Sequence, residues 1–410
     1  MPLKKIYLSY KQLPNDVWWL LGADVALQLI NAAFALLLNY VMIDHGYKDY
    51  DITSINGNRY LAVLICAYPL SILSNRVNVR TLLFIGSITA PLLSLLMLWC
   101  IHFHVSELLR VITFVWGISF SLVQILTLPI LMNLTSEDNE TEAISLFFAI
   151  GSFTTIVCGT LNYVIHLVLP DFSNISLLAI YCFVACFGPY CIFRLTHSDK
   201  KKETDVIYRT TRSDWKRIGE VLIPVFLIAF GAGFTIPFIN LFFKFVHNVD
   251  APVFSLMNTV AFVLVVLGGF INPIIKRKLG YKFAITFFQA LAIIVLFLLG
   301  TTEWIKQYAF APMLAMGLFV VRQPLMNIAG PLTTELSMKY VGEHNRKLIS
   351  AIISAIWSGS WFISAVLFSI LREMKIAYSN IIFITVGFYI LGVVWYYLLI
   401  IKFERTSTVS

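Results

Sequence analysis

Twelve long apolar stretches, separated by shorter polar segments, dominate the pattern of hydrophobic and polar positions along the chain. A helix needs about 20 predominantly apolar residues to cross a bilayer, and each stretch reaches or approaches that length. We therefore expect an all-α membrane protein with twelve transmembrane helices. The predicted spans are 17–42, 57–75, 79–101, 108–133, 142–168, 174–195, 218–246, 252–275, 281–300, 308–338, 347–371 and 379–402. The longer stretches imply tilted helices, or helices that extend into the membrane interface.

The first stretch carries a polar stripe on an otherwise apolar helix. Asp24, Gln28 and Asn31, with Asn39 further along, follow at helical spacing and fall within about 90° of the helix circumference. A carboxylate inside hydrocarbon costs at least about 2.5–3.5 kcal/mol on insertion scales, so Asp24 should face protein or water and not lipid. The stripe therefore predicts the wall of a cavity inside a helical bundle.

Composition agrees with this assignment. Hydrophobic residues make up 59% of the chain and charged residues 13%, compared with about 25% charged residues in ordinary soluble chains. The mean hydropathy is +0.82. The first apolar stretch is too long and too polar on one side for a cleavable signal peptide. The six cysteines lie inside apolar segments without metal-ligand spacing, so we expect them to pack as small apolar residues.

Lysine and arginine are distributed unevenly between the two sides of the predicted membrane. An even number of spans puts both termini on one side, and 22 of the 30 basic residues fall on that side. The seven on the other side are Lys48, Arg59, Arg110, Lys244, Lys306, Arg372 and Lys375, and Arg322 lies inside a span. The positive-inside rule then predicts cytoplasmic termini in a plasma or inner membrane. The basic residues behind the net charge of +8 lie in the segments between spans, where their distribution sets orientation, and no nucleic-acid partner is expected.

The chain divides into two similar halves. The polar segment 196–217 predicts a cytoplasmic linker between a six-helix bundle at 1–195 and another at 218–410; its basic residues either bind anionic lipid or, as we favour, are simply solvated. Three short matches recur in chain order: Gly22-Ala23-Asp24 with Gly231-Ala232-Gly233, Pro129 with Pro331, and Gly151-Ser152 with Gly359-Ser360. Spans one, four and five thus correspond to spans seven, ten and eleven, which is typical of a parallel repeat about an axis along the membrane normal.

Twelve spans, a parallel repeat of six, a basic central segment and cytoplasmic termini resemble the major facilitator superfamily, over essentially the whole chain. The family's Gly-x-x-x-Asp-Arg-x-Gly-Arg-Lys loop between spans two and three is degraded here, because Ser71, Asn75 and Asn78 replace two glycines and the acid while Arg76 and Arg80 remain. The equivalent loop between spans eight and nine keeps Lys276, Arg277, Lys278, Gly280 and Lys282. The signatures of drug:proton antiporters, sugar porters, peptide porters and organophosphate exchangers are missing, so no subfamily is indicated.

The resemblance implies that spans one, four, seven and ten line a central cavity, and these spans carry the strongest polar signals. The candidate substrate and coupling residues are Asp24, Gln28, Asn31, Trp116, Gln124, Asn240, Arg322, Gln323, Asn327 and Trp357. Trp116 and Trp357 are predicted near mid-span, where a substrate-facing role and a packing role are equally open. Polar residues at helical spacing in span five are more typical of helix packing.

Asp24 and Arg322 are the two ionisable groups deepest in these spans. Their predicted depths differ by about 10 Å at 1.5 Å per residue, which helix bending at Pro324 and a long arginine side chain can close. A pair of this kind, broken by a proton or by a substrate carboxylate, couples two binding events. The alternatives are a fixed structural ion pair, or Arg322 bonded to backbone carbonyls near the proline.

An acidic segment interrupts the basic pattern on the side of the termini. Glu137 and Glu140 are candidate gate residues with Arg76, Arg80 and Arg346 as partners, although a solvated loop explains the segment equally well. The sequence has no phosphate loop, nucleophile triad or metal-ligand spacing, and we therefore expect neither an enzyme nor a cofactor or metal. His102 and His104 are the nearest approach to a metal pair.

These observations predict a secondary active transporter that moves a small organic solute by alternating access. Protons are the expected coupling ion, through Asp24, and the solute is expected to be amphipathic or weakly anionic. The bilayer is the other expected partner, and the chain is expected to be a monomer in the cell inner membrane. The alternatives are a lipid or lysolipid flippase on the same fold, and a sensor of the same family that binds its ligand without transport.

Overall fold

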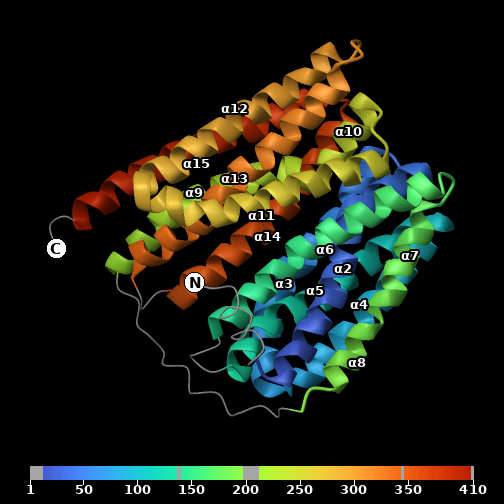
Figure 1. Ribbon diagram of the computed structural model, residues 1–410, viewed down its shortest axis with the longest axis horizontal. Helices are drawn as coiled ribbons and strands as arrows, with labels where there is room; N and C mark the ends of the chain where they lie inside the picture. The colour runs from blue at the N-terminus through green and yellow to red at the C-terminus, as the bar shows by residue number, and fades with distance from the viewer. Residues whose placement is uncertain (1–12, 136–139, 197–211, 343–345, 408–410) are drawn as a thin grey trace. The chain divides into compact units, whose positions relative to one another are not determined.

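The computed structural model describes residues 13–135, 140–196, 212–342 and 346–407, and within these ranges every regular element is helical (Figure 1). The chain forms two compact units. Unit 1 is made of Met1–Tyr47 and Asn58–Thr204, and unit 2 of Lys48–Gly57 and Asp205–Ser410. Helix α3 therefore begins in unit 2 and continues in unit 1. Most of the predicted linker 196–217 lies outside the described residues and stays a prediction.

Seven helices form unit 1, apart from the beginning of α3. They are α2 (Asn15–Asp44), α3 (Asp49–Arg76), α4 (Val79–His102), α5 (Ser106–Leu134), α6 (Glu140–Val168), α7 (Asn174–Ala185) and α8 (Phe187–Phe193). The last two are the halves of one predicted span. The helix is interrupted at Cys186, just before Gly188 and Pro189, because proline cannot donate to the preceding turn.

Unit 2 contains the remaining elements. They are α9 (Arg212–Thr235), η1 (Ile236–Phe238), α10 (Ile239–His247), α11 (Ala251–Lys282), η2 (Phe283–Phe287), α12 (Phe288–Thr301), η3 (Thr302–Ile305), α13 (Ala311–Val341), α14 (Arg346–Glu373) and α15 (Tyr378–Ser407). The seventh predicted span is broken into α9 and α10 by a short 3-10 segment that contains Pro237. The loop expected between spans eight and nine is a turn at Gly280, whose φ of 73° is accessible to glycine without strain.

Each of the twelve predicted spans coincides with one of these helices or with a broken pair. Eleven of the described helices are long and apolar enough to cross a membrane. The exception is α3, which is long enough but carries Asp49, Asp51 and Arg59 in the part that precedes its apolar half. The prediction began this span at residue 57, and the helix in fact begins at Asp49.

Helix α2 lies at the centre of unit 1, packed against α4, α5, α6, α7 and α8 (Figure 1). Small residues allow these close contacts: a Cβ on Gly188 would lie 3.2 Å from that of Ala26, and one on Gly22 would lie 3.2 Å from the sulfur of Cys191. Four of the six free cysteines are buried, as expected of small packing residues. The polar stripe of α2 is therefore held in a rigid setting.

In unit 2, α9 packs against α14 and α15, while α13 packs against α11 and α12. Gly233 and Ser364 mark the tightest contact between α9 and α14, since a Cβ on the glycine would lie 2.7 Å from the serine Cβ. Two side-chain hydroxyls also bond to the backbone of α9. Ser364 of α14 donates to the Phe230 carbonyl, and Thr385 of α15 donates to the Gly231 carbonyl. These helices form the frame around the cavity described next.

Candidate functional site

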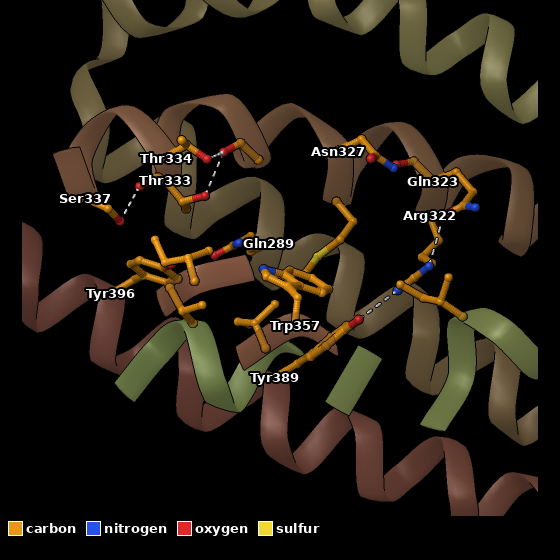
Figure 2. A pocket seen from close by; sticks show the side chains of 16 residues that line it. Gln289, Arg322, Gln323, Asn327, Thr333, Thr334, Ser337, Trp357, Tyr389 and Tyr396 are labelled. Atoms are coloured by element: carbon orange, nitrogen blue, oxygen red, sulfur yellow. Dashed lines mark hydrogen bonds between the residues drawn. The ribbon is translucent and has the colours of Figure 1, made fainter. Parts of the chain in front are cut away.

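Unit 2 encloses a cavity of about 300 Å³ between α9, α12, α13, α14 and α15 (Figure 2). Its polar lining consists of Gln289, Arg322, Gln323, Asn327, Thr333, Thr334, Ser337, Tyr389 and Tyr396, and Trp357 adds a large aromatic face. Apolar walls come from side chains such as Val225, Ile228 and Ile353. No described lining residue is acidic. The cavity therefore combines one cation with neutral hydrogen-bonding groups and an aromatic surface.

Arg322 is the charged group of this cavity, and only 3% of its surface is exposed. Nη1 donates to Oε1 of Gln323 at 3.0 Å, and Nη2 donates to the hydroxyl of Tyr389 at 3.3 Å (Figure 2). Nε is buried without a partner. Among the described residues no carboxylate pairs with the guanidinium, so its charge is balanced only by neutral dipoles.

The sequence of α13 explains this arrangement. Arg322 and Gln323 are adjacent just before Pro324, and Asn327 lies one turn after Gln323, where its side chain donates to the Gln323 carbonyl at 2.8 Å. About two turns further along, the hydroxyls of Thr333 and Thr334 both donate to the Gly330 carbonyl. These side chains bond to their own helix, which leaves hydroxyl and amide oxygens available as acceptors toward the cavity.

Six polar lining residues were not predicted as site residues: Gln289, Thr333, Thr334, Ser337, Tyr389 and Tyr396. Gln289 is 3% exposed and its Oε1 has no partner, while Tyr389 and Tyr396 project from α15 on the same face. The sequence carried a signal for Gln289 and for the two tyrosines. Gln289 is an isolated amide in an otherwise apolar segment, and the two tyrosines are seven residues apart, which is two helical turns.

Asp24 lies in unit 1 and is 1% exposed. Gln28, one turn along α2, is the polar group that interacts with its carboxyl, but the geometry falls short of a hydrogen bond and both carboxylate oxygens lack a partner in the described structure. Gln28 and Asn31 are joined by a hydrogen bond of 3.2 Å. Two members of the predicted stripe, Gln28 and Asn31, are therefore bonded to each other, and Asp24 lies one turn before them. Asp24 belongs to unit 1 and Arg322 to unit 2, so the predicted pair between them stays a prediction.

Arg59 was counted with the basic residues on the side opposite the termini, and that assignment stays a prediction. The residue lies well inside α3 and is half-buried, and its Nη2 donates to Oδ1 of Asn31 at 2.8 Å. The guanidinium carbon stands 4.6 Å from the ring centroid of Trp116 and 4.9 Å from that of Phe120. The polar stripe of α2 thus has a cationic partner on α3.

The other candidates in these spans take different positions. Trp116 is 1% exposed, is stacked on Phe34, and donates its indole N–H to Ser94 at 2.8 Å, so that donor is already used. Gln124 is exposed on α5. Asn240 is buried in α10 outside the cavity and accepts from the backbone N–H of Leu241.

The candidate gate residues are described only in part. Arg80 donates to the carbonyl of Phe193 at the end of α8, at 2.6 Å. Glu137 and the side chains of Arg76, Glu140 and Arg346 fall outside the described structure, so the gate stays a prediction. His102 lies 5.7 Å, ring to ring, from His45, but no group of three potential metal ligands occurs among the residues described.

The chain belongs to the Major Facilitator Superfamily, whose family model matches residues 19–365. Solved structures with a similar fold include a variant of the nucleoside transporter NupG, with a TM-score of 0.74 and 13% identity over 94% of this chain and 100% of that one. A D-xylose–proton symporter follows with a TM-score of 0.73 and 14% identity, covering 92% of this chain and 96% of that chain. A bacterial homologue of the iron transporter ferroportin, in an inward-facing state, has a TM-score of 0.72 and 12% identity, over 94% and 98% of the two chains.

These comparisons confirm the all-α fold of two six-helix bundles expected from the sequence, and they indicate a multi-pass membrane transporter. No curated protein matches the chain by sequence. At these identities the likeness to the solved structures shows the fold alone.

Proposed function

We propose that the protein is a secondary transporter that binds a small, weakly anionic organic solute in the unit 2 cavity and carries it by alternating access. Protons are the proposed coupling ion, with Asp24 as the group that receives them. The protein is proposed to act as a monomer in the cell inner membrane with both termini in the cytoplasm, on the distribution of its basic residues.

The observation that carries this proposal is the state of Arg322. A buried charge is usually paired, because desolvation of an isolated ion is costly. Here the guanidinium has two neutral acceptors, an unpartnered Nε and no described carboxylate. An incoming carboxylate supplies the missing charge and accepts two parallel N–H bonds from the planar fork.

The remaining lining residues narrow the class of solute. Gln289 and Asn327 offer both donors and acceptors, the threonine and serine hydroxyls offer acceptors, and Trp357 offers an apolar face. A cavity of about 300 Å³ is at the small end of ligand sites. These features favour a compact monocarboxylate with further hydroxyl or amide groups, and they disfavour a polyanion, for which a single arginine supplies too little charge.

Asp24 supports proton coupling because its carboxyl is buried without a partner inside a span. An ionised carboxylate is costly there, and binding a proton removes the charge and with it that cost. The two linked events are then the binding of a proton at Asp24 and the binding of the anionic solute at Arg322, as in a symporter.

The test is a thermal-stability screen of the purified protein with sodium salts of small monocarboxylates and with the matching amides. We expect at least one carboxylate to raise the unfolding temperature while its amide does not. Arg322→Gln should abolish that stabilisation, and the exposed-lysine variant Lys306→Gln, in the same unit, should retain it. Equal stabilisation of Arg322→Gln by the same salt would refute the anion site. Transfer of labelled lipid between leaflets of reconstituted vesicles, with no response to carboxylates, would instead support the flippase alternative.

A further inference from the structure

The cavity of unit 2 holds a second buried polar group, apart from Arg322, whose part in binding the proposed function leaves open. Gln289 lies on α12 with 3% of its surface exposed, and its side chain lines the cavity (Figure 2). Its Oε1 has no hydrogen-bond partner among the described residues. Rotation about the last side-chain bond is soft, so the amide can present this oxygen to a bound molecule. Because an unsatisfied buried acceptor is costly, Gln289 suits a ligand that donates a hydrogen bond.

The backbone just before Gln289 is also unusual. Phe283–Phe287 form a π-helical segment, η2, and α12 begins at the next residue, Phe288. π-Helical turns are rare and occur frequently at functional sites, since the extra residue changes which side chains of the helix face inward. Gln289 is the only amide side chain in α12. The segment therefore orients a single hydrogen-bonding group in an otherwise apolar stretch.

Gln289 and Arg322 lie at different levels of the cavity. Leu296 and Leu299 of α12 line a small hollow beside Arg322, and Gln289 lies seven residues, or two helical turns, before Leu296. At 1.5 Å per residue the two levels are about 10 Å apart along the helix. Figure 2 shows Trp357 between the two side chains. A solute that reaches both groups therefore carries its donor away from its carboxylate.

The lining further along α13 from Arg322 also favours a donor on the solute. The hydroxyls of Thr333 and Thr334 donate to the Gly330 carbonyl, and that of Ser337 donates to the Thr333 carbonyl. A hydroxyl whose hydrogen is used in this way offers only its oxygen lone pairs. These side chains therefore add acceptors to the one that Gln289 provides.

Charge decides which kind of donor fits. Arg322 is the one charged group among the described residues that line the cavity, and the solute's carboxylate neutralises it. An ammonium group on the same solute would leave one positive charge unbalanced in a buried site, which is costly. A hydroxyl donates a hydrogen bond without adding charge, so the site favours a hydroxyl.

We propose that the solute is a hydroxycarboxylate with its hydroxyl at the far end of a short carbon chain, and that Gln289 selects it by accepting the hydroxyl's hydrogen bond while Arg322 holds the carboxylate. This inference rests on the proposed function and specifies its solute. Two hydrogen bonds of about 2.8 Å take up part of the separation and leave roughly 4–5 Å between carboxylate and hydroxyl, the length of a chain of about four or five carbons. A plain carboxylate leaves Oε1 of Gln289 unsatisfied and binds more weakly.

The test compares the four- and five-carbon carboxylates that end in a hydroxyl with those in which a methyl group replaces it. Dissociation constants come from the dependence of the unfolding temperature of the purified, full-length protein on ligand concentration. We expect at least one hydroxycarboxylate to bind about tenfold more tightly than its methyl counterpart. Moving the hydroxyl to the carbon beside the carboxylate, or replacing it by an ammonium group, should remove this advantage.

Substitution of Gln289 assigns the advantage to this residue. Gln289→Leu should weaken binding of the hydroxycarboxylate about tenfold and leave its methyl counterpart bound at least as tightly as in the wild type. Gln289→Met also removes the acceptor and gives the same reading if Gln289→Leu does not fold. Asn258→Leu is the matched control, because Asn258 is a buried amide on α11 that is not among the described lining residues. Equal binding of hydroxyl and methyl compounds by the wild type, or a preference that survives in the folded Gln289 variants, would overturn the proposal.

The outcome is separable from that of the proposed function. Binding of carboxylates that depends on Arg322 but not on the hydroxyl refutes the role of Gln289 and leaves the anion site standing. A preference for the hydroxyl that depends on Gln289, and persists in Arg322→Gln and in the amides of the same compounds, supports the role of Gln289 and counts against the anion site. Absence of binding by all of these compounds overturns both.

Discussion

Asp49→Asn gives the most sharply defined stability prediction, because this side chain is the centre of a cluster at one end of unit 2. Its Oδ2 accepts from Nε of Arg372 at 2.5 Å and from the hydroxyl of Tyr378 at 2.9 Å. The Arg372 guanidinium lies 3.9 Å from the Tyr378 ring centroid and also donates to the Ile376 carbonyl. The substitution keeps the shape and removes the charge.

The magnitude follows from burial. Removing one partner of a fully buried ion pair costs about 3–5 kcal/mol, whereas an exposed pair contributes about 0–1 kcal/mol. The side chains of Arg372 and Asp49 are 18% and 12% exposed, which places this pair nearer the buried limit. Asparagine retains an oxygen for Tyr378 and Arg372, so we expect a loss of about 2 kcal/mol.

The assay is thermal unfolding of the purified protein in detergent, followed by far-ultraviolet circular dichroism. A loss of about 2 kcal/mol corresponds to a fall of about 4–8 °C for a unit of this size. Asp250→Asn is the matched control, since Asp250 pairs with Lys244 at 2.7 Å but is 70% exposed, and it should change the unfolding temperature by less than about 2 °C. Equal shifts for the two variants would refute the reasoning from burial.

Three other substitutions have clear expected results. Gln289→Leu removes a buried oxygen without a partner, so it should leave stability unchanged or raise it by about 1 kcal/mol while weakening carboxylate-dependent stabilisation, as thermal unfolding with and without the salt will show. Gly233→Ala places a methyl group 2.7 Å from the Ser364 Cβ and should cost about 1–3 kcal/mol; an unfolding temperature equal to that of wild type would contradict the packing described for α9 and α14. Asp24→Asn should abolish gradient-driven uptake into vesicles but leave counterflow exchange, and unchanged uptake would remove Asp24 from the coupling step.

Hydropathy was sufficient to predict the fold because backbone groups in lipid must bond within each helix. All twelve spans were located. Asp24 of the polar stripe is buried, as expected, while the role of the stripe as the wall of a cavity stays a prediction. The interruptions near Pro237 and Gly188 were not predicted as breaks. Hydropathy averaged over a whole span does not resolve a break of a few residues, because the apolar residues on both sides dominate the average.

The candidate site was predicted in part. Arg322, Gln323, Asn327 and Trp357 do line one cavity, because a polar group in an apolar span is energetically tolerated only where it meets other polar groups. Arg59 lies at the start of the predicted span 57–75 and was counted only toward orientation, because hydropathy gives no sign of its contacts with Asn31 and Trp116. Such a residue is recognised only once its neighbours in space are known.

The central claim is that a buried acid and a buried arginine link proton movement to the movement of an anion. The most direct measurement places the protein in vesicles that contain a pH-sensitive dye and adds outside the carboxylate that stabilises it against unfolding. We predict acidification of the interior that depends on Asp24 and Arg322 and is lost when either is neutralised. Uptake of the carboxylate without any change of internal pH would contradict the account.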